Sequence, residues 1–420
     1  MKDRNENRLG YKKTLIGWIP QEWQTTILGH VTEVIFSNVD KKLGFDEQGV
    51  LLCNYMDVYY NQEITSDIEF MKGTASIREI EKYKLQIGDV IITKDSETPD
   101  DIAVSAIVRE DISNLVCGYH LAIIRPQDNG LCADYLNKLF RAPSIRRKFS
   151  VLANGVTRFG LTSSVIKNTL IPFPPFAEQR NIAEIISTWE ETIKQTSKLV
   201  EAKKRYKRAL LQRLSSPKNK LKDLSPHEWR VRSLGELIEP ISRPEPKPQK
   251  PYLSIGVRSH GKGTFQKIAE FPEKVFMDTL FRVESNDLIV NITFAWEGAI
   301  AIAKEQDTGG LVSHRFPTYR LKEKEVNTDF LSNLIQTKRL VQDLGLISPG
   351  GAGRNRVLNQ KDFLKLRVSV PSIKTQTEIA KILTTADDEI SLLESYLDAL
   401  ERQKSGLMQK LFTGEVRVKT

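Results

Sequence analysis

Three groups of residues in this chain resemble catalytic motifs, and the first is a set of carboxylates. Glu97, Asp100 and Asp101 follow a strand-like run, and two or three carboxylates in one loop can hold the metal of a nuclease. Such a site also needs a Glu-x-Lys segment, but residues 109–112 lack the lysine. We therefore interpret the three carboxylates as a solvated acidic loop.

The second group is the sequence GVRSHGK at residues 256–262, which matches the first part of a phosphate-binding P-loop. The next residue should be the Ser or Thr that binds magnesium, but it is Gly263. A helix should follow, whereas Pro272 comes soon after and no helical period is visible. This pattern indicates a basic surface turn, which could touch phosphates.

The third group, Phe173-Pro174-Pro175-Phe176, is similar to the PP-aromatic core of amino-methyltransferases. That core needs Asn, Asp or Ser before the prolines to hold the target amino group, and Phe173 cannot do so. The prolines are more simply the stop before a helix, with one proline near its first turn. The five histidines lie in no recognisable motif, so we expect no catalytic machinery and no bound cofactor or metal in this chain.

The composition predicts two or three globular domains with a basic surface. The chain has 420 residues, 40% of them hydrophobic, and 62 basic against 53 acidic residues give a net charge of +9. This charge suits a polyanion such as nucleic acid, although many basic proteins bind none. Cys53, Cys117 and Cys132 form no disulfide or zinc pattern. With no apolar run of membrane-spanning length and no signal-peptide core, we expect a cytoplasmic location and no membrane contact.

Two long helices organise the rest of the chain. Residues 174–214 return as residues 371–411 with a constant shift of 197, so that Gln179 matches Gln376. In the second copy, apolar residues recur at steps of four and three: Ile379, Leu383, Ala386, Ile390, Leu393, Leu397, Leu400, Leu407 and Leu411. A helix can bury such a heptad seam only against another helix. The simplest partner for each helix is therefore the other one.

Lysines interrupt both seams at the same repeat position, Lys207 and Lys404. The simpler interpretation, which we favour, is that both side chains snorkel from the edge of the seam. The alternative is that they meet acidic groups on a partner helix.

A second repeat opens each half of the chain. The pattern P-x-E-W-x4-L-G occurs from Pro20 to Gly29 and again from Pro226 to Gly235, and we expect its Trp to be a packing anchor. Between the opening and the helix, strand-like runs are similarly placed in both halves: Gly88–Thr93, Ile102–Val108 and His120–Arg125 in the first, and Asn286–Asn291, Ala299–Ala303 and Phe316–Leu321 in the second. A predicted helix follows in each, at Asp134–Phe149, where Pro143 should break it, and at Asp329–Leu344. Each half is thus a small α/β or α+β domain.

The repeats predict a pseudo-twofold arrangement. If the two helices pack antiparallel, two similar domains present the same face to a partner. Double-helical DNA has matching symmetry, with one turn of about 34–36 Å. Since the two domains differ in sequence, their half-sites should differ, which predicts an asymmetric, bipartite DNA target with an unread spacer.

At this point the chain resembles the specificity (S) subunit of a Type I restriction–modification enzyme. The resemblance rests on the P-x-E-W-x4-L-G openings, the P-x4-Q-x2-I-A entries to the helices, and the L-[LM]-Q-[KR]-L exits, the second followed by Phe412-Thr413-Gly414. It covers nearly the whole chain, twice and in order. Two departures are small: Thr375 replaces the usual Glu before Gln376, and Leu214 is followed by two serines instead of Thr-Gly.

The resemblance implies an α/β (α+β) fold with two pseudo-symmetric target recognition domains, separated by two long antiparallel coiled-coil helices that act as a ruler. It implies a non-catalytic subunit with double-stranded DNA, two modification subunits and restriction (translocase) subunits as partners. S-adenosylmethionine, ATP and magnesium would then be bound by those partners. We place the recognition domains at residues 1–173 and 217–370, and the spacer helices at residues 174–216 and 371–420, the latter with the C-terminal tail.

Candidate contact residues come from chemistry, because the family motifs mark the frame and not the reading surface. Basic, polar and aromatic side chains in loops after matched strands or in glycine-bearing turns are our candidates for DNA contact, although each could equally be a solvated surface group or, for the Trp, a core residue: Lys94, His120, Arg158, Arg258, His260, Lys262, Thr293, Trp296, His314, Arg315, Arg354 and Arg356. On the helices we expect partner contacts from Gln179, Lys207, Gln376 and Lys404.

Two other hypotheses remain open. The chain could be a nuclease or methyltransferase that works alone, in which case the purified protein with cofactor and metal would modify DNA. It could also be a coiled-coil tether whose domains contact proteins, in which case the assembled complex would show no salt-dependent DNA binding.

Overall fold

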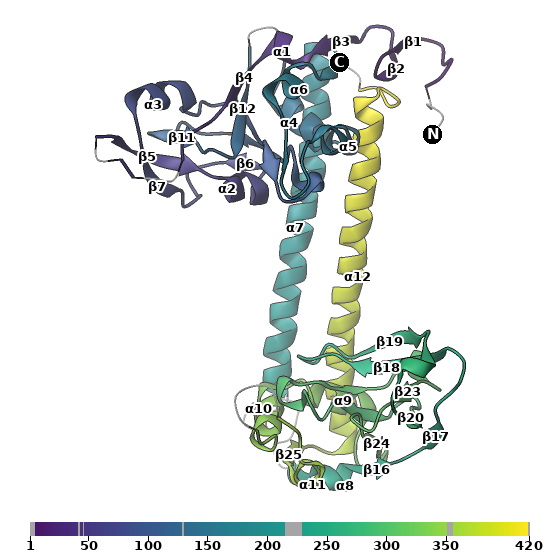
Figure 1. Cartoon of the computed structure of the whole chain (residues 1–420). Helices are drawn as coiled ribbons and strands as arrows, with labels where there is room; N and C mark the ends of the chain where they lie inside the picture. The colour runs from purple at the N-terminus through teal and green to yellow at the C-terminus, as the bar shows by residue number, and fades with distance from the viewer. Residues whose placement is uncertain are drawn as a thin grey trace. The chain divides into compact units, whose positions relative to one another are not determined.

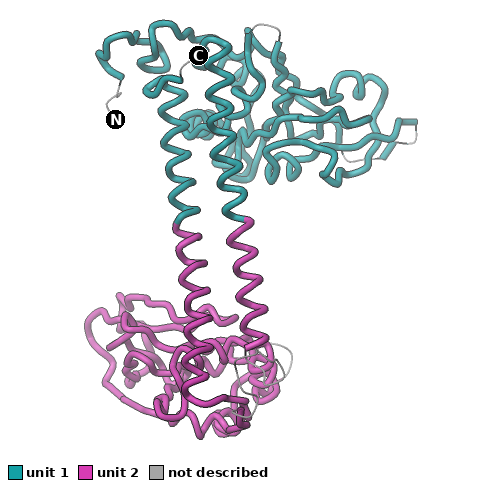
Figure 2. The backbone as a smooth tube through the Cα atoms, turned by 180° about the vertical axis from the view of Figure 1, so that it is seen from behind, with its two compact units in different colours: residues 1–197, 396–420 teal, residues 198–395 magenta. Residues whose placement is uncertain are grey.

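The computed structural model describes residues 5–40, 43–44, 46–127, 130–214, 229–350 and 356–418. The chain divides into two compact units, which Figure 2 shows in different colours: residues 1–197 with 396–420 form unit 1, and residues 198–395 form unit 2. The expected boundary between residues 216 and 217 lies outside the described residues. No helix in the described part of the chain is both long enough and apolar enough to cross a membrane.

Unit 1 is built around two main sheets, to which pairs of short strands are added. The larger one has the strand order β4-β12-β8-β10-β6, with bounds Thr32–Phe36, Leu121–Pro126, Val90–Thr93, Ser105–Val108 and Glu63–Ile64. The smaller one has the order β11-β5-β7, with bounds Leu115–Cys117, Gln48–Cys53 and Met71–Ala75. Strands β8 and β10 are buried on both faces, because one apolar cluster packs on each side of the larger sheet. This explains why both strands read as continuous apolar runs and do not alternate.

Unit 2 repeats the order of the larger sheet in its sheet β16-β24-β21-β22, with bounds Ile238–Ile241, Thr318–Leu321, Leu288–Val290 and Ile300–Ile302. The three matched pairs of strands predicted from the sequence therefore occupy the same places, β8 with β21, β10 with β22 and β12 with β24. A second sheet has the order β17-β20-β23-β18-β19, with bounds Pro244–Pro246, Thr279–Arg282, Leu311–Val312, Tyr252–Val257 and Thr264–Ala269. The proline-bearing β17 lies at the edge of this sheet, where strand prolines are tolerated.

The helix predicted after the strands is broken in both units. In unit 1, α4 (Ala133–Arg141) and α5 (Pro143–Leu152) are separate helices, and Pro143 is the first residue of α5, as its missing N–H favours. In unit 2 the predicted single helix is also two, α9 (Thr328–Leu334) and α10 (Lys338–Leu346). The continuous prediction was wrong here because Thr337 caps α10 by accepting a hydrogen bond from the N–H of Leu340.

The two long helices are confirmed. Helix α7 spans Phe176–Leu214 and α12 spans Ile373–Phe412, so each continues from one unit into the other, and Figure 1 shows both. In unit 2 the helices pair in antiparallel fashion, with Lys203 against Glu389 at 2.5 Å and Lys207 against Asp387 at 2.6 Å. The apolar seam is covered, with buried residues that include Ile186, Val200, Ile379, Leu383, Ile390 and Leu400.

In each half, the Trp of the opening segment is a packing anchor, as we expected. In unit 1, β3 (Gln24–Ile27) pairs with β14 (Leu170–Phe173), and Trp23 is fully buried. Its Nε1 donates to Oε2 of Glu178 at 2.8 Å. In unit 2, β15 (Arg230–Ser233) pairs with β25 (Arg367–Val370), and Trp229 is partly buried against the core. Each opening segment therefore ties the start of a half to the entry of its long helix.

Candidate nucleic-acid interface

In unit 1 the structure brings together two of the predicted residues, His120 and Arg158. The short strands β9 (Asp95–Ser96) and β13 (Phe159–Gly160) pair, and this brings Asp95 of β9 close to Arg158, which directly precedes β13. Nδ1 of His120 lies 2.7 Å from Oδ1 of Asp95, and a guanidinium nitrogen of Arg158 lies 3.0 Å from the same oxygen. Arg158 remains 59% exposed. Its guanidinium therefore has a fixed carboxylate partner and a free edge for a base or phosphate.

This cluster opens into a hollow of about 370 Å³, whose lining includes Tyr55 and Tyr59 of α2 (Tyr55–Tyr60). Their rings stack with centroids 5.7 Å apart, and the Tyr59 hydroxyl donates to Asp101 at 3.1 Å. This hydrogen bond raises the pKa of Tyr59. The sequence analysis missed these aromatic residues, although the YMDVYY run at i, i+4 spacing was a signal for a one-sided aromatic face.

The loop carboxylates have local structural partners. Asp101 accepts hydrogen bonds from Tyr59 and from Thr98, the latter at 2.7 Å, and Asp100 accepts one from Ser150 at 3.3 Å. Within the described ranges, no group of three or more His, Cys, Asp and Glu side chains is arranged to hold a metal ion.

Lys94, which we expected to contact DNA, is instead packed against aromatic side chains. Its Nζ donates to the carbonyl oxygen of Ser37 at 2.8 Å and lies over the rings of Tyr119 and Phe36, at 4.5 and 5.2 Å from their centroids. Burial lowers the pKa of this ammonium group, against the opposite effect of nearby Asp95. In this state Lys94 is a packing element that holds Tyr119 in place, and Tyr119 is the half-exposed side chain.

In unit 2 the P-loop-like residues 256–262 run from the end of β18 into the turn of the hairpin β18–β19. A strand, not a helix, follows the turn, so the predicted surface turn is correct. The turn is held against the 3-10 helix η4 (Ala295–Glu297) by hydrogen bonds from the His260 N–H to the Glu297 carbonyl and from the Gly261 N–H to the Gly298 carbonyl, at 2.8 and 3.1 Å. Both His260 and Gly261 have φ above +60°, which bends the turn tightly.

Three predicted residues project from this hairpin turn. His260 and Lys262 are exposed, and the exposed Arg258 lies over the Phe265 ring at 5.1 Å while donating to the Thr264 carbonyl. His314 and Arg315 are also exposed, and the Arg315 carbonyl accepts a hydrogen bond from the N–H of Ile292, next to the η4 segment. We call these five side chains the unit 2 basic surface: Arg258, His260, Lys262, His314 and Arg315.

Thr293, Trp296 and Arg356 lie together, and their polar groups contact one another or nearby backbone. Nε1 of Trp296 donates to the Thr293 carbonyl at 3.0 Å, and the Arg356 guanidinium lies 5.2 Å from the Trp296 ring centroid. Arg356 also donates to the carbonyls of Ser348 and Gly345, at 3.1 and 2.6 Å. These contacts assign Trp296 and Arg356 to packing in this state. Arg354 lies outside the described residues.

The two helix glutamines have the same role in each unit. Gln179 is fully buried, accepts from the Cys132 N–H and donates to the carbonyls of Gly130 and Pro174. Gln376 is buried too, accepts from the Asn327 N–H and donates to the carbonyls of Glu325 and Pro371. Because both amides are used inside the unit, we correct their assignment from partner contact to positioning of the domain on its helix.

Lys207 and Lys404 meet carboxylates of the facing helix. Lys207 lies 2.6 Å from Asp387 in unit 2, and Lys404 lies 3.6 Å from Glu190 in unit 1. The snorkelling interpretation was therefore wrong, and the alternative describes both lysines. Glu190 and Asp387 are themselves related by the shift of 197 residues, so one ion pair occurs once in each unit.

Comparisons with known proteins match this architecture. The family model described as "Type I restriction modification DNA specificity domain" matches twice, at residues 20–202 and 226–402. A protein of Methanocaldococcus jannaschii named for the MjaX type I restriction enzyme specificity subunit is 26% identical over 429 residues, covering 98% of this chain and 97% of that protein. The MjaVIII specificity subunit of the same organism is 22% identical over 68% of this chain and 71% of its own length.

Two solved structures share the fold. One is from a study of complex assembly and conformational transition of a type I restriction–modification system, with a TM-score of 0.60 and 16% identity over 95% of this chain and 99% of that one. The other is the HsdS subunit from Thermoanaerobacter tengcongensis, with a TM-score of 0.52 and 16% identity over 95% and 98%.

Proposed function

The chain belongs to the family of Type I restriction–modification DNA specificity subunits, and we propose that each of its units reads one half of an asymmetric, bipartite DNA site. Like its family, it is a DNA-recognition subunit and not the catalytic one. One observation most strongly supports the proposal that each unit reads a different half-site. The same strand order carries unlike surfaces, the Asp95–His120–Arg158 cluster in unit 1 and the unit 2 basic surface.

The chemistry of the two surfaces predicts different half-sites. Arg158 is held by Asp95, so its guanidinium can approach a base edge in one orientation, as bidentate recognition requires. In unit 2, the exposed Lys262 is a point charge suited to phosphate, and Arg258 can reach guanine.

The long helices supply the partner surface. Large apolar side chains on their unit 2 portions face solvent, with exposed fractions of 45% for Leu199, 60% for Tyr206 and 72% for Leu392. Leu199 and Tyr206 lie on α7 and Leu392 on α12, and exposed apolar groups of this size are suited to protein contacts. We assign this surface to two modification subunits, which would carry S-adenosylmethionine, with restriction subunits that use ATP and magnesium joining the complex. Work on the host's DNA would place the assembly in the cytoplasm.

The experiment is salt-dependent DNA binding by the assembled methyltransferase complex. With Lys262→Ala, binding should weaken on all sequences and the slope of log affinity against log salt should fall by about one, because one phosphate contact is lost. Lys361→Ala, which removes an exposed lysine of α11 (Gln360–Lys365) in the same unit, is the control and should leave the slope unchanged. Wild-type complex without any salt-dependent binding would support the tether hypothesis instead.

A further inference from the structure

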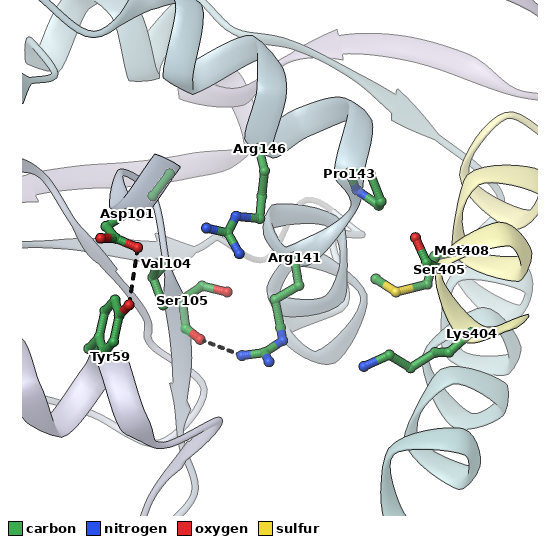
Figure 3. Close-up of a pocket in the computed structure, with 11 residues that line it drawn as sticks. Tyr59, Asp101, Val104, Ser105, Arg141, Pro143, Arg146, Lys404, Ser405 and Met408 are labelled. Carbon is green, nitrogen blue, oxygen red and sulfur yellow. Dashed lines mark hydrogen bonds between the residues drawn. The ribbon is translucent and has the colours of Figure 1, made fainter. Parts of the chain in front are cut away.

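A cationic pocket lies in unit 1, beside the hollow of the proposed reading surface, with which it shares Tyr59 and Asp101. Figure 3 shows Arg141 of α4, Arg146 of α5 and Lys404 of α12 extending into the same space. The cavity has a volume of about 390 Å³, and its lining also includes Tyr59, Asp101 and Met408. Three helices and a loop therefore converge on one cavity with three cations and one carboxylate in its wall.

Next to the cavity, one buried carboxylate lies close to three cationic side chains. Glu190 is 8% exposed, and it lies 2.5 Å from Lys138, 3.8 Å from Arg141 and 3.6 Å from Lys404. Lys138 is nearly fully buried, and Arg141 and Lys404 are 25% and 20% exposed. Burial lowers the pKa of both Arg141 and Lys404, because desolvation disfavours their charged forms; Glu190 acts against this shift, and the neighbouring cations add to it. An anion bound in the cavity would offset part of the positive charge of Arg141 and Lys404.

The duplicate in unit 2 shows that the fold does not require these cations. The pair Lys404–Glu190 has its counterpart in Lys207–Asp387, and α4 aligns with α9 through Asp134 and Asp329. At the positions of Lys138 and Arg141, α9 and the turn after it carry Asn333 and Gln336. Unit 1 thus adds two cations beside an ion pair that both units share.

We propose that this pocket binds a phosphate group. A guanidinium and an ammonium that converge on a recessed space give the donor set that phosphate prefers, and Arg141 and Lys404 provide it. The cavity is larger than one phosphate ion, so it can also hold the organic part of a small phosphorylated ligand beside Tyr59 and Met408. We assign the phosphate to a small free ligand, since the two cations lie mostly below the surface, and a backbone phosphate of DNA is the other source of the same chemistry. The proposal is independent of which bases the units read.

Calorimetric titration of the full chain at constant ionic strength, in chloride, with inorganic phosphate, pyrophosphate and adenosine monophosphate tests the proposal. Wild type should bind at least one of the three. Lys404→Gln and Arg141→Gln should weaken this binding about tenfold or more, the usual effect of losing one charge-assisted hydrogen bond. Arg141→Gln places the side chain type of the duplicate, Gln336, in unit 1. Lys207→Gln is the matched control, because it removes the same interhelical ion pair in unit 2 and should leave phosphate affinity unchanged.

A second arm distinguishes the two sources. If the titrations are silent but Lys404→Gln lowers the salt slope of duplex binding by about one while Lys207→Gln does not, the phosphate comes from DNA. Silent titrations together with an unchanged slope would overturn the proposal, as would equal loss of phosphate binding in both lysine variants. Either result would leave the DNA-reading function untouched.

Discussion

A chain lengthened by four residues in each long helix should direct methylation to the same two half-sites with a longer unread spacer. The insertions follow Glu201 in α7 and Glu394 in α12, between the ion pairs Lys203–Glu389 of unit 2 and Lys404–Glu190 of unit 1. Four residues add about 6 Å and roughly one helical turn, which corresponds to one or two base pairs of about 3.4 Å. On the original spacer, activity should fall at least about a hundredfold, because one half-site is lost and each mismatched pair costs about 1–3 kcal/mol.

The measurement is adenine methylation of a duplex library in which only spacer length varies. Insertion of two residues in each helix is the control, since it turns the helix by about 200° and should abolish methylation at every spacer length. Altered half-site sequences, or retention of the original spacer, would show that the helices do not set the spacing.

The variant Arg417→Met should lower the stability of unit 1 by about 2 kcal/mol, because a buried carboxylate loses its cation. Nε and one terminal nitrogen of Arg417 lie 2.8 and 3.0 Å from the two oxygens of Glu178, whose side chain is 2% exposed. Arg417 also reaches Glu22 at 2.9 Å, and the hydrogen bond with Glu178 raises its pKa. Since Arg417 is itself 37% exposed, we expect less than the cost of breaking a fully buried pair. The tail thus fastens the opening segment to the entry of α7.

Thermal unfolding of the full chain followed by tryptophan fluorescence measures this effect. A loss of about 2 kcal/mol in a unit of this size lowers Tm by roughly 4–8 °C. Glu178→Gln combined with Arg417→Met should cost less than the sum of the two single variants, because the buried charge is gone. Strict additivity of the two losses would exclude the ion pair as the cause. Unit 2 has the uncharged Thr375 at the position of Glu178, so this carboxylate is a feature of unit 1.

The matched strands and the long helices of this protein were predictable because their sequence patterns occur twice in the chain. Matched strands such as β8 and β21 share local apolar patterns, and the long helices share a heptad seam. Because residues close together in the sequence carry these patterns, they were sufficient to predict the elements. The surfaces were less predictable. Lys94 is covered by Phe36 and Tyr119, and Trp296 by Arg356, and these neighbours lie 25 to 60 residues away along the chain. No local pattern shows whether such a loop cation faces solvent or an aromatic ring.

The partners of Lys207 and Lys404 were hidden for the same reason. Each faces a carboxylate about 200 residues away, and only the shift of 197 relates the two pairs. The positioning role of Gln179 was equally invisible, because its partners Gly130 and Cys132 lie in a loop with no recognisable motif.

Single-molecule sequencing of methylated adenine, in a host that supplies the partner subunits, with and without this gene, tests the central claim most directly. Our account predicts one split motif with two unlike halves and an unread spacer of fixed length, methylated only when the gene is present. Identical methylation patterns in the two strains would contradict it.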